Sequence, residues 1–487
     1  MSSRGCTGLG EKRAKSPGDL QRDEHDHLDP IYKVCGVMKL AGLSLSEHVG
    51  GPLPATALAV GARATNPTGL ALDPVKDQAL FEDLSGVRGR SFIASIVRAI
   101  RNDGAGRSLR FVSGHTGAGK STELARLRHA LEQVRTQREG DVLKTVAPKA
   151  QVLMLDAFPL VREIADLDLE DLLVGLWQQL IEQHAASTGA LLATFWKNNI
   201  AKLLQATLKD LPSVVADALQ KLSVSLRSPV ERRHAKTALF AIEDALIEGL
   251  NSGFERLRDD PSSPMVVIID NLEKLSERSR DAVEKLYLER LAPLLRLDAH
   301  LVLSAPSFLL FEAKGQLLTS AYGAEVLFVP MVKVRRPQGE GGGEYEEGVG
   351  KLASLLARRV NFDALFEGGM SAARHIAVLS GGRIRDALMI VHRAINEIDD
   401  GKVPLAVIDA VADREVTQRS RGLPEAWSAS LRFVQEKNRF PPGISSQDRA
   451  DMLRGGYVLE YQNGEPNPFY VVHPLIERTA VVRSPLS

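Results

Sequence analysis

Five short apolar runs lie along the middle of the chain, and each has the composition of a buried β-strand. They occupy residues 109–113, 152–155, 265–269, 301–303 and 326–329. The run at 265–269 has no polar position, which is typical of a central parallel strand that is covered on both faces. Segments with apolar residues at three- and four-residue spacing separate the runs. Strands that alternate with helices predict an α/β fold with a parallel, doubly wound sheet.

Helical patterns predict the remaining parts of the folded chain. Residues at about 160–257 are apolar at helical spacing almost throughout, which predicts a large helical insertion within a core at 76–335. A glycine-rich linker and the helical pattern after it predict an α-helical lid, the two together spanning 336–400. Helices followed by two apolar runs around Asn463-Gly464, a strong hairpin signal, predict a winged-helix domain at 401–487.

The first 75 residues have a different composition. Residues 1–30 are charged and poor in apolar side chains, while residues 50–74 are rich in Gly, Ala, Pro and Thr. Such compositions bury too little apolar surface to form a core, so residues 1–75 are expected to be disordered. The acidic and histidine-containing run at 23–27 is then a solvated tail, because nothing nearby would fix the geometry of a metal site.

Composition narrows the class of protein. The chain has 487 residues, of which 44% are hydrophobic and 25% charged, and its 61 basic and 61 acidic residues balance. This length predicts about two to four domains, and the balanced charge gives no sign of a strongly nucleic-acid-binding chain. No apolar run approaches the roughly 20 residues that span a bilayer. Since Cys6 and Cys35 are the two cysteines, no disulfide framework is indicated, and a cytoplasmic protein without membrane association is expected.

The strongest chemical motif follows the first predicted strand. Gly114, Gly119, Lys120 and Ser121 fit the pattern G-x-x-x-x-G-K-[ST], the P-loop or Walker A motif. The backbone N–H groups of such a turn, together with the positive end of the following helix, form a concavity for phosphate oxygens. Lys120 is expected to reach the β- and γ-phosphates, and the Ser121 hydroxyl to bind Mg²⁺. The predicted nucleotide-binding residues are Gly114, His115, Thr116, Gly117, Ala118, Gly119, Lys120, Ser121 and Thr122.

An acidic residue ends the third predicted strand, where a P-loop protein needs a carboxylate for Mg²⁺. Asp270 occupies this position, and we expect its strand to lie next to the P-loop strand. Glu273 follows three residues later and is the candidate general base that polarises the attacking water. Each has a structural alternative, Asp270 as the start of a turn and Glu273 as an acidic residue in the first turn of a capped helix. Beside a P-loop, the two acids predict an ATPase that uses ATP and Mg²⁺.

The P-loop, the Asp-terminated strand, the helical lid and the winged-helix end together resemble the AAA+ and STAND branch of P-loop NTPases. Over roughly residues 80–487 the chain is similar to origin-recognition-type ATPases and to bacterial ATPases of conflict systems. The resemblance implies that Arg90 lies near the adenine. It implies that Ser304 is at the sensor 1 position, in contact with the γ-phosphate or the attacking water. It also implies that Arg385 is the sensor 2 arginine of the lid, with Arg383 as the alternative.

The resemblance raises the question of an arginine finger, which one subunit supplies to the nucleotide of its neighbour. Arg290 and Arg296, on the helical segment before the fourth strand, are the candidates, and a surface charge is the alternative for each. Oligomerisation is left open.

The predicted function is an ATP-binding and ATP-hydrolysing molecular switch that couples its nucleotide state to a partner. The partner is expected to be a protein effector on a separate chain. The alternative is a nucleotide-controlled DNA-binding initiator or regulator, but residues 405–487 contain ten basic and ten acidic residues, which argues against a strong phosphate-contacting surface. A P-loop kinase is a poorer alternative, because the sequence has a lid and a winged helix where a kinase needs an acceptor pocket.

Overall fold

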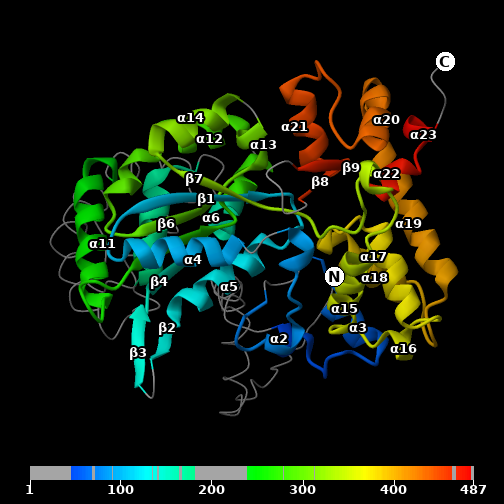
Figure 1. Ribbon diagram of the computed structural model, residues 1–487, viewed down its shortest axis with the longest axis horizontal. Coiled ribbons are helices and arrows are strands. Elements are labelled where there is room, and N and C mark those ends of the chain that lie inside the picture. The colour runs from blue at the N-terminus through cyan, green and yellow to red at the C-terminus, as the bar shows by residue number, and fades with distance from the viewer. Residues whose placement is uncertain are drawn as a thin grey trace, which may run out of the picture.

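The computed structural model contains two connected parts, an α/β core and a mostly helical part beside it (Figure 1). The described residues are 45–67, 72–89, 92–133, 135–139, 142–147, 149–163, 167–180, 239–277, 279–311, 313–462 and 468–483. The core contains the P-loop, and the helical part contains the lid, an N-terminal segment and the C-terminal domain. No helix among the described residues has both the length and the apolar character needed to cross a membrane.

The core is built on a five-stranded parallel sheet with the order β4-β5-β6-β1-β7. The strands are β1 (Ser108–Gly114), β4 (Gln151–Asp156), β5 (Met265–Asp270), β6 (His300–Ser304) and β7 (Glu325–Val329). Neighbouring strands are parallel, which confirms the predicted α/β P-loop architecture. The expectation that β5 lies next to β1 is wrong, because β6 lies between them and separates the two strands by two spacings, about 10 Å.

Helices cover both faces of the sheet, and this explains the unbroken apolar run of β5, whose residues are all buried. Val266 and Ile268 pack into one hydrophobic cluster, while Val267 and Ile269 pack into the cluster on the opposite face. The alternation of side chains along a strand requires this division. The first face is covered by α4 (Phe92–Asp103) and α5 (Lys120–Glu132). The second face is covered by residues 169–180 and α11 (Glu243–Leu257).

The segment between β5 and β6 is less regular than a single helix. It is divided into η4 (Leu272–Glu277), α12 (Arg280–Glu284), the π-helical η5 (Lys285–Arg290) and η6 (Ala292–Arg296). Pro293 lies in the first turn of η6, where its missing N–H interrupts the α-helical ladder. Helices α13 (Ser307–Phe311) and α14 (Ala313–Tyr322) follow β6. The antiparallel hairpin of β2 (Arg135–Glu139) and β3 (Val142–Ala147) is a further element that the sequence pattern does not predict.

Most of the helical insertion predicted at about 160–257 lies outside the described residues. Its described parts are α6 (Phe158–Glu163), residues 169–180 and α11. The Trp177 side chain is buried, and its Nε1 donates to the carbonyl of Leu246 at 3.1 Å. This contact holds the helical residues 169–180 to α11, so Trp177 belongs to the packing surface, as its helical spacing predicts.

The lid lies in the helical part of the protein. Its helices are α15 (Glu346–Ala357), α16 (Phe362–Leu365), α17 (Met370–Leu379) and α18 (Ile384–Asn396). The linker before it contains η7 (Gln338–Glu340) and a β-bridge between Arg335 and Glu344. The linker predicted from glycine content therefore has a fixed path next to the lid.

The expectation of disorder for residues 1–75 is wrong for residues 45–67 and 72–75, while residues 1–44 and 68–71 lie outside the described residues. The N-terminal segment forms α2 (Leu45–Val49), α3 (Leu58–Ala64), η1 (Gln78–Leu80) and η2 (Gly86–Arg88). Helix α3 packs against α18 of the lid, and a Cβ added to Gly61 would lie 3.0 Å from Ile395 Cδ1. The small residues that suggest disorder in the sequence permit this close helix contact.

Hydrogen bonds fasten the same N-terminal segment to the lid at two further places. The Ala55 N–H donates to the carbonyl of Arg359 at 2.9 Å. Farther along the segment, the carboxylate of Glu82 accepts hydrogen bonds from three side chains of the lid. The donors are Lys351 Nζ at 2.7 Å, Ser354 Oγ at 2.8 Å and Arg358 Nε at 2.9 Å. The segment is therefore attached to the lid over much of its length.

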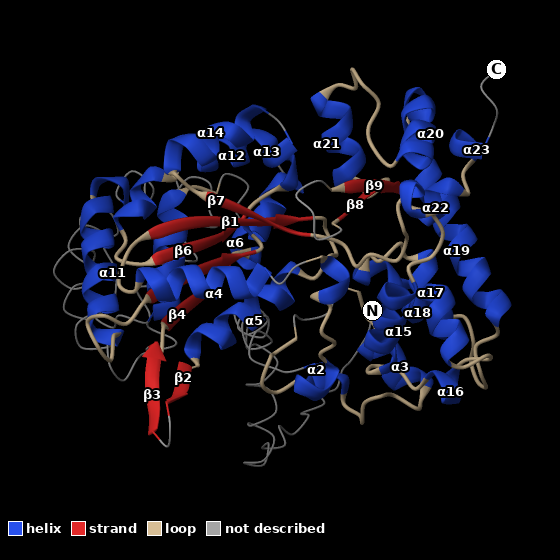
Figure 2. Cartoon of the chain, in the orientation of Figure 1, coloured by secondary structure: helices blue, strands red, loops and turns tan. Residues whose placement is uncertain are grey.

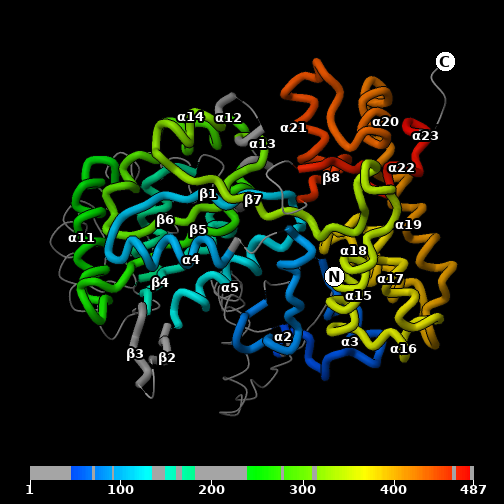
Figure 3. The backbone as a smooth tube through the Cα atoms, in the orientation of Figure 1, coloured from blue at the N-terminus to red at the C-terminus, as the bar shows by residue number. Residues whose placement is uncertain are grey.

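The C-terminal domain is helical except for one short antiparallel pair of strands (Figure 2). Its elements are α19 (Leu405–Ser420), η8 (Glu425–Trp427), α20 (Ser428–Lys437), α21 (Ser446–Arg454), β8 (Val458–Tyr461), β9 (Phe469–Val472), α22 (Pro474–Glu477) and α23 (Ala480–Arg483). In the pair, Val458 lies opposite Val472 and Tyr461 opposite Phe469. Asn463-Gly464, the predicted turn, lies outside the described residues. Figure 3 follows the chain from the lid into this domain and back toward the core, where α21 contacts α13.

Candidate nucleotide-binding site

The P-loop lies between β1 and α5, as the sequence predicts. Gly117 and Gly119 have φ angles of 85° and 91°, in the left-handed region that favours glycine. A Cβ on Gly117 would lie 2.7 Å from the Cβ of Arg385 in the lid. Glycine at this position is thus required both by the turn and by the lid that lies against it.

Lys120 is the first residue of α5, and its side chain is buried. Its Nζ donates to the backbone carbonyls of Gly114 at 3.1 Å and His115 at 3.3 Å. The same Nζ lies 3.3 Å from Oε1 of Glu273. The ammonium group is therefore held within the loop, beside the positive end of α5, where it can exchange these oxygens for those of a phosphate.

Asp270 ends β5 and is buried. Burial and, to a smaller extent, the nearby Glu273 raise its pKa to about 7, although hydrogen bonds from the Ser121 hydroxyl and from the Asn271 N–H act to lower it. The Asn271 N–H donates to Asp270 Oδ1 at 2.7 Å. The Ser121 hydroxyl and the Asp270 carboxylate thus converge as two oxygen donors, the ligand type that Mg²⁺ prefers. These residues fit a magnesium ion, whose charge would stabilise the ionised form of Asp270.

Glu273 lies in the first turn of η4, as its structural alternative predicts, but its side chain also reaches the P-loop. Burial acts to raise the pKa of Glu273, and the opposing effects of Lys120 and of the Ser304 hydroxyl leave it lowered. Ser304 ends β6, and its Oγ accepts a hydrogen bond from the Leu272 N–H at 2.8 Å. Ser304 therefore fixes the start of η4 and contacts the predicted base, which gives it a place between the P-loop and the strand that bears Asp270.

The two candidate arginines of the lid, Arg383 and Arg385, both contact the P-loop, one through its side chain and the other through its backbone. The N–H of Arg385 donates to the carbonyl of Gly117 at 3.3 Å, and its side chain is exposed. Arg383 is mostly buried, and its Nε donates to the carbonyl of Thr116 at 2.8 Å. The guanidinium of Arg383 thus contacts the loop directly, while that of Arg385 lies at the surface beside it.

Arg90, the residue expected near the adenine, lies outside the described residues. The stretch before it contributes Arg88, which the sequence analysis does not single out. The buried Arg88 donates through Nη1 to Oε1 of Glu123 on α5 at 2.8 Å and through Nη2 to the carbonyl of Ala118. Arg88 therefore holds the backbone of the P-loop from its outer side. Its proximity in sequence to Arg90 is the only signal for this role, since Glu123 reads as an ordinary helical residue.

His115 connects the P-loop to the C-terminal domain. Its ring is buried, with Nδ1 placed 3.1 Å from the carbonyl of Leu453 and Nε2 accepting from the N–H of Glu460 at 3.1 Å. One nitrogen faces an acceptor and the other a donor, so the neutral ring with its proton on Nδ1 satisfies both. Burial lowers the pKa of His115 to about 3, which keeps the ring neutral. Sequence reasoning assigns His115 to the nucleotide, but the side chain is directed to α21 and β8.

A buried charge cluster extends from the P-loop into the same domain. Asp386 on α18 lies 3.4 Å from Arg383 Nη1, 2.7 Å from Arg419 Nη2 and 2.9 Å from His473 Nε2. Burial acts to raise the pKa of Asp386, but Arg383, His473 and Arg419 hold it well below its usual range. Because Arg383 also contacts Thr116, the cluster joins the P-loop, the lid and the C-terminal domain.

The two arginine-finger candidates form ion pairs within the chain. Arg290 lies 3.4 Å from Asp168, 2.6 Å from Glu170 and 3.3 Å from Glu243. Arg296 pairs with Asp244. Both arginines therefore have local carboxylate partners, in agreement with the surface-charge alternative.

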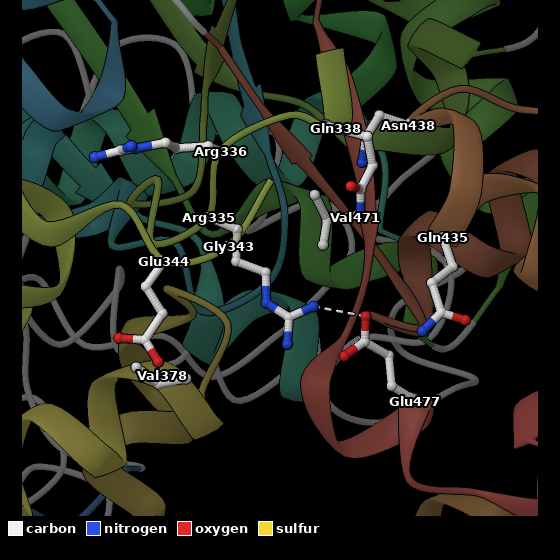
Figure 4. Close-up of a pocket in the computed structure, with 10 residues that line it drawn as sticks. All are labelled: Arg335, Arg336, Gln338, Gly343, Glu344, Val378, Gln435, Asn438, Val471 and Glu477. Atoms are coloured by element: carbon white, nitrogen blue, oxygen red, sulfur yellow. Dashed lines mark hydrogen bonds and ion pairs between the residues drawn. The ribbon is translucent and has the colours of Figure 1, made fainter. Parts of the chain in front are cut away.

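A cavity of about 160 Å³ lies where the linker meets the C-terminal domain (Figure 4). Arg335 crosses it and donates to Oε1 of Glu477 at 2.6 Å. The other lining residues are Arg336, Gln338, Gly343, Glu344, Val378, Gln435, Asn438 and Val471. P-loop residues do not line this cavity, so it is separate from the candidate nucleotide site.

The buried His115 predicts a pH dependence of stability. Its pKa is about 6.5 in an unfolded chain and about 3 here, so the folded state binds fewer protons between these values and loses stability as the pH falls below 6.5. At pH 5 the loss from His115 is about 2 kcal/mol. Urea unfolding at pH 7 and at pH 5 measures this loss in the free energy of unfolding. The His115→Gln protein, which can donate and accept without titrating, should lose about 2 kcal/mol less than the wild type; an equal loss in both proteins would contradict this assignment.

Comparison with known proteins gives structural matches alone, since no protein family and no curated protein sequence matches the chain. The ADP form of the Aeropyrum pernix ORC2 protein is similar, with 12% identity and a TM-score of 0.37 over 82% of this chain and 94% of that one. Cdc6p from Pyrobaculum aerophilum is similar at 13% identity and a TM-score of 0.34, over 86% and 96%. The Walker-type ATPase of Pyrococcus abyssi is similar at 11% identity and a TM-score of 0.35, over 79% and 93%. By its own sheet and P-loop the chain has an α/β P-loop fold.

Proposed function

We propose that the protein is an ATP-binding and ATP-hydrolysing molecular switch in which the nucleotide state of the P-loop sets the position of the lid and of the C-terminal domain. One observation carries the proposal. His115 and Thr116, adjacent residues of the P-loop, contact the C-terminal domain and the lid through hydrogen bonds of 3.1 Å and 2.8 Å. A ligand that changes the loop therefore acts on both parts at once.

ATP binding on this proposal uses groups that already converge. The backbone N–H groups of the P-loop and Lys120 bind the phosphates, and Lys120 gives up its contacts with Glu273 and with the loop carbonyls. Ser121 and Asp270 would hold Mg²⁺, which would supply positive charge against the negative charge that develops on the phosphate oxygens. The Cβ of Arg385 lies next to Gly117, and on this proposal its exposed side chain contacts the nucleotide from the lid.

Hydrolysis then follows from the release of Glu273. When Lys120 binds a phosphate, it no longer pairs with the Glu273 carboxylate. Glu273 can then accept a proton from a water that attacks the γ-phosphorus in line with the leaving ADP oxygen. The lowered pKa of Glu273 supports this role, because the base starts in its ionised form. Ser304 holds Glu273 and the first turn of η4 in place. The products are ADP and inorganic phosphate.

The coupling to the C-terminal domain runs through the contacts described above. Arg383 links Thr116 to Asp386, and Asp386 links the lid to His473 at the start of α22. Movement of Thr116 on ATP binding or of Arg385 on product release would shift this cluster. We therefore propose that the C-terminal domain, which the sequence predicts to be a winged helix, changes its exposure to a partner with each nucleotide state.

The proposed partner is a protein on a separate chain. In the C-terminal domain, α21 faces the core, where Arg280 Nη1 donates to Gln447 Oε1 at 2.8 Å and Ala450 packs into the core cluster. The charged side chains of α21 are Asp448, Arg449, Asp451 and Arg454, whose charges cancel. A helix that carries no net charge and already packs on its own core is poorly suited to a phosphate backbone, so the DNA-binding alternative is less well supported.

Two measurements test the proposal. Purified protein with Mg²⁺ should release phosphate from ATP, and absence of both ATP binding and phosphate release would overturn the switch. Filter binding of duplex DNA across a salt series should give no binding, or weak binding that does not depend on salt. Tight, salt-sensitive binding of DNA would instead favour the nucleotide-controlled initiator or regulator.

A further inference from the structure

Two side chains outside the predicted site, those of Asp156 and Asn271, meet beside Asp270 at the carboxyl ends of β4 and β5. Strands β4 and β5 end in register, with Asp156 opposite Asp270. Asn271 Nδ2 donates to Asp156 Oδ1 at 2.8 Å and lies 3.5 Å from Asp270 Oδ2. The N–H of Phe158 donates to the same Asp156 oxygen at 2.9 Å, so the Asp156 carboxylate is oriented by its own turn. The amide of Asn271 thus lies between two carboxylates.

Asn271 also has an unusual backbone. Its φ angle is 62°, and Asn438 is the only other non-glycine residue with positive φ in the described parts of the chain. Asn tolerates this conformation because its short side chain can form local hydrogen bonds, and here the acceptor is Asp156. The hydrogen bond to Asp156 therefore stabilises a backbone turn that most residues would avoid.

The turn at Asn271 determines where the predicted catalytic groups lie. Its N–H donates to Asp270 Oδ1 at 2.7 Å and fixes that carboxylate. The next N–H, of Leu272, donates to Ser304 Oγ at 2.8 Å across the end of β6. This path brings Glu273 back to Lys120 although β5 and β1 are not adjacent. An extended backbone at residue 271 would direct Asp270 and Glu273 away from the P-loop.

We propose that Asp156 and Asn271 are positioning residues for magnesium-dependent ATP binding, and this inference rests on the function proposed above. Asp156 accepts from the Asn271 amide and thereby holds the left-handed turn. This backbone turn orients the Asp270 carboxylate toward the Ser121 hydroxyl. Outer partners that orient metal ligands typically change metal affinity about 10-fold to 100-fold when they are removed.

The test measures the Mg²⁺ requirement of nucleotide binding, without relying on turnover. The probe is N-methylanthraniloyl-ATP, titrated against the full chain at a series of Mg²⁺ concentrations and in EDTA. Asp156→Ala should raise the Mg²⁺ concentration for half-maximal binding about 10-fold and leave binding in EDTA unchanged. Asp156→Asn, which keeps the acceptor oxygen, should stay within about 2-fold of the wild type. Asn271→Gly, which tolerates the turn but lacks the amide, should behave like Asp156→Ala.

Controls separate positioning from charge and from general loss of structure. Asp281→Ala removes an exposed carboxylate on α12 and should leave the Mg²⁺ requirement unchanged. If Asp156→Ala and Asp156→Asn raised the Mg²⁺ requirement equally, the charge of Asp156 alone would matter, and the inference would be overturned. An unchanged Mg²⁺ requirement in Asp156→Ala would overturn it as well. Thermal unfolding of each variant identifies a merely structural effect, which would alter binding in EDTA as well. If the wild type binds no nucleotide, the proposed function fails and this inference fails with it.

Discussion

Replacement of Lys120 by Ala is expected to lower the affinity for ATP about 100-fold or more. The ammonium group is buried within the P-loop, and its contacts are the loop carbonyls and Glu273, so its removal leaves the phosphates without their main positive side chain. Loss of one partner from a buried, charge-assisted contact typically costs 2–5 kcal/mol, roughly 30-fold to several thousand-fold in affinity. Calorimetric titration of ATP with Mg²⁺ measures the change.

A matched control uses the lysine that lies nearest in sequence to the predicted base. Lys274 follows Glu273 on η4, and its Nζ lies 4.1 Å from the centre of the Phe158 ring. Lys274→Ala removes the same charge without touching the P-loop, and we expect it to bind ATP as the wild type does. Unchanged ATP affinity in Lys120→Ala would refute the assignment of the phosphate site.

The second large effect is expected on turnover alone. In Glu273→Gln, the rate constant for ATP hydrolysis should fall about 100-fold to 10,000-fold, the usual contribution of a general base. The affinity for ATP should be retained or rise, because the amide no longer holds Lys120 as an ion pair. Phosphate release under saturating ATP and a separate binding titration measure the two quantities.

Glu289→Gln, an exposed carboxylate on η5, is the matched control and should hydrolyse ATP at the wild-type rate. Equal hydrolysis by Glu273→Gln and the wild type would exclude Glu273 as the base. A parallel loss of binding and turnover would instead assign Glu273 to the support of Lys120. The two measurements therefore distinguish the catalytic from the structural alternative.

The sequence predicts those features that depend on local patterns. The strands were predictable because a sheet covered on both faces demands apolar side chains at every position, as in β5. The P-loop was predictable because its glycines have backbone angles that few other residues adopt. Their spacing to Lys120 and Ser121 is equally local.

The order of the strands and the partners of individual side chains depend on distant parts of the chain. Nothing local indicates that β6 lies between β1 and β5. His115 lies at a position of the motif that accepts any residue, and its partners Leu453 and Glu460 are more than 300 residues away. The same holds for Asn271, whose role depends on the register between β4 and β5. A single sequence carries no signal for such contacts.

The N-terminal segment was misjudged for a related reason. Composition measures the apolar surface that a segment could bury by itself, and residues 50–74 have little of it. Helix α3 instead uses small residues such as Gly61 to approach α18, whose apolar face is already built from the lid. The segment also forms a small hydrophobic cluster of its own, in which Leu45, Val49, Ala64, Leu72 and Leu80 are buried together. Its few apolar positions are sufficient because the lid supplies the rest of the packing surface.

The attachment of the N-terminal segment gives the lid a second connection to the core through the chain, in addition to its hydrogen bonds with Thr116 and Gly117 of the P-loop. One of the two chain connections is the linker that follows β7. The other is the N-terminal segment, in which Glu82 binds the lid and the guanidinium of Arg88 donates to the carbonyl of Ala118 in the P-loop. A body joined at two points has fewer ways to move than one joined at a single point. While both connections persist, the lid is limited to rotations about the line between them, and a wide swing away from the P-loop would first require α3 and Glu82 to detach. In the proposed switch, the amplitude of lid movement would therefore be limited by a segment that lies before the nucleotide-binding core in the chain.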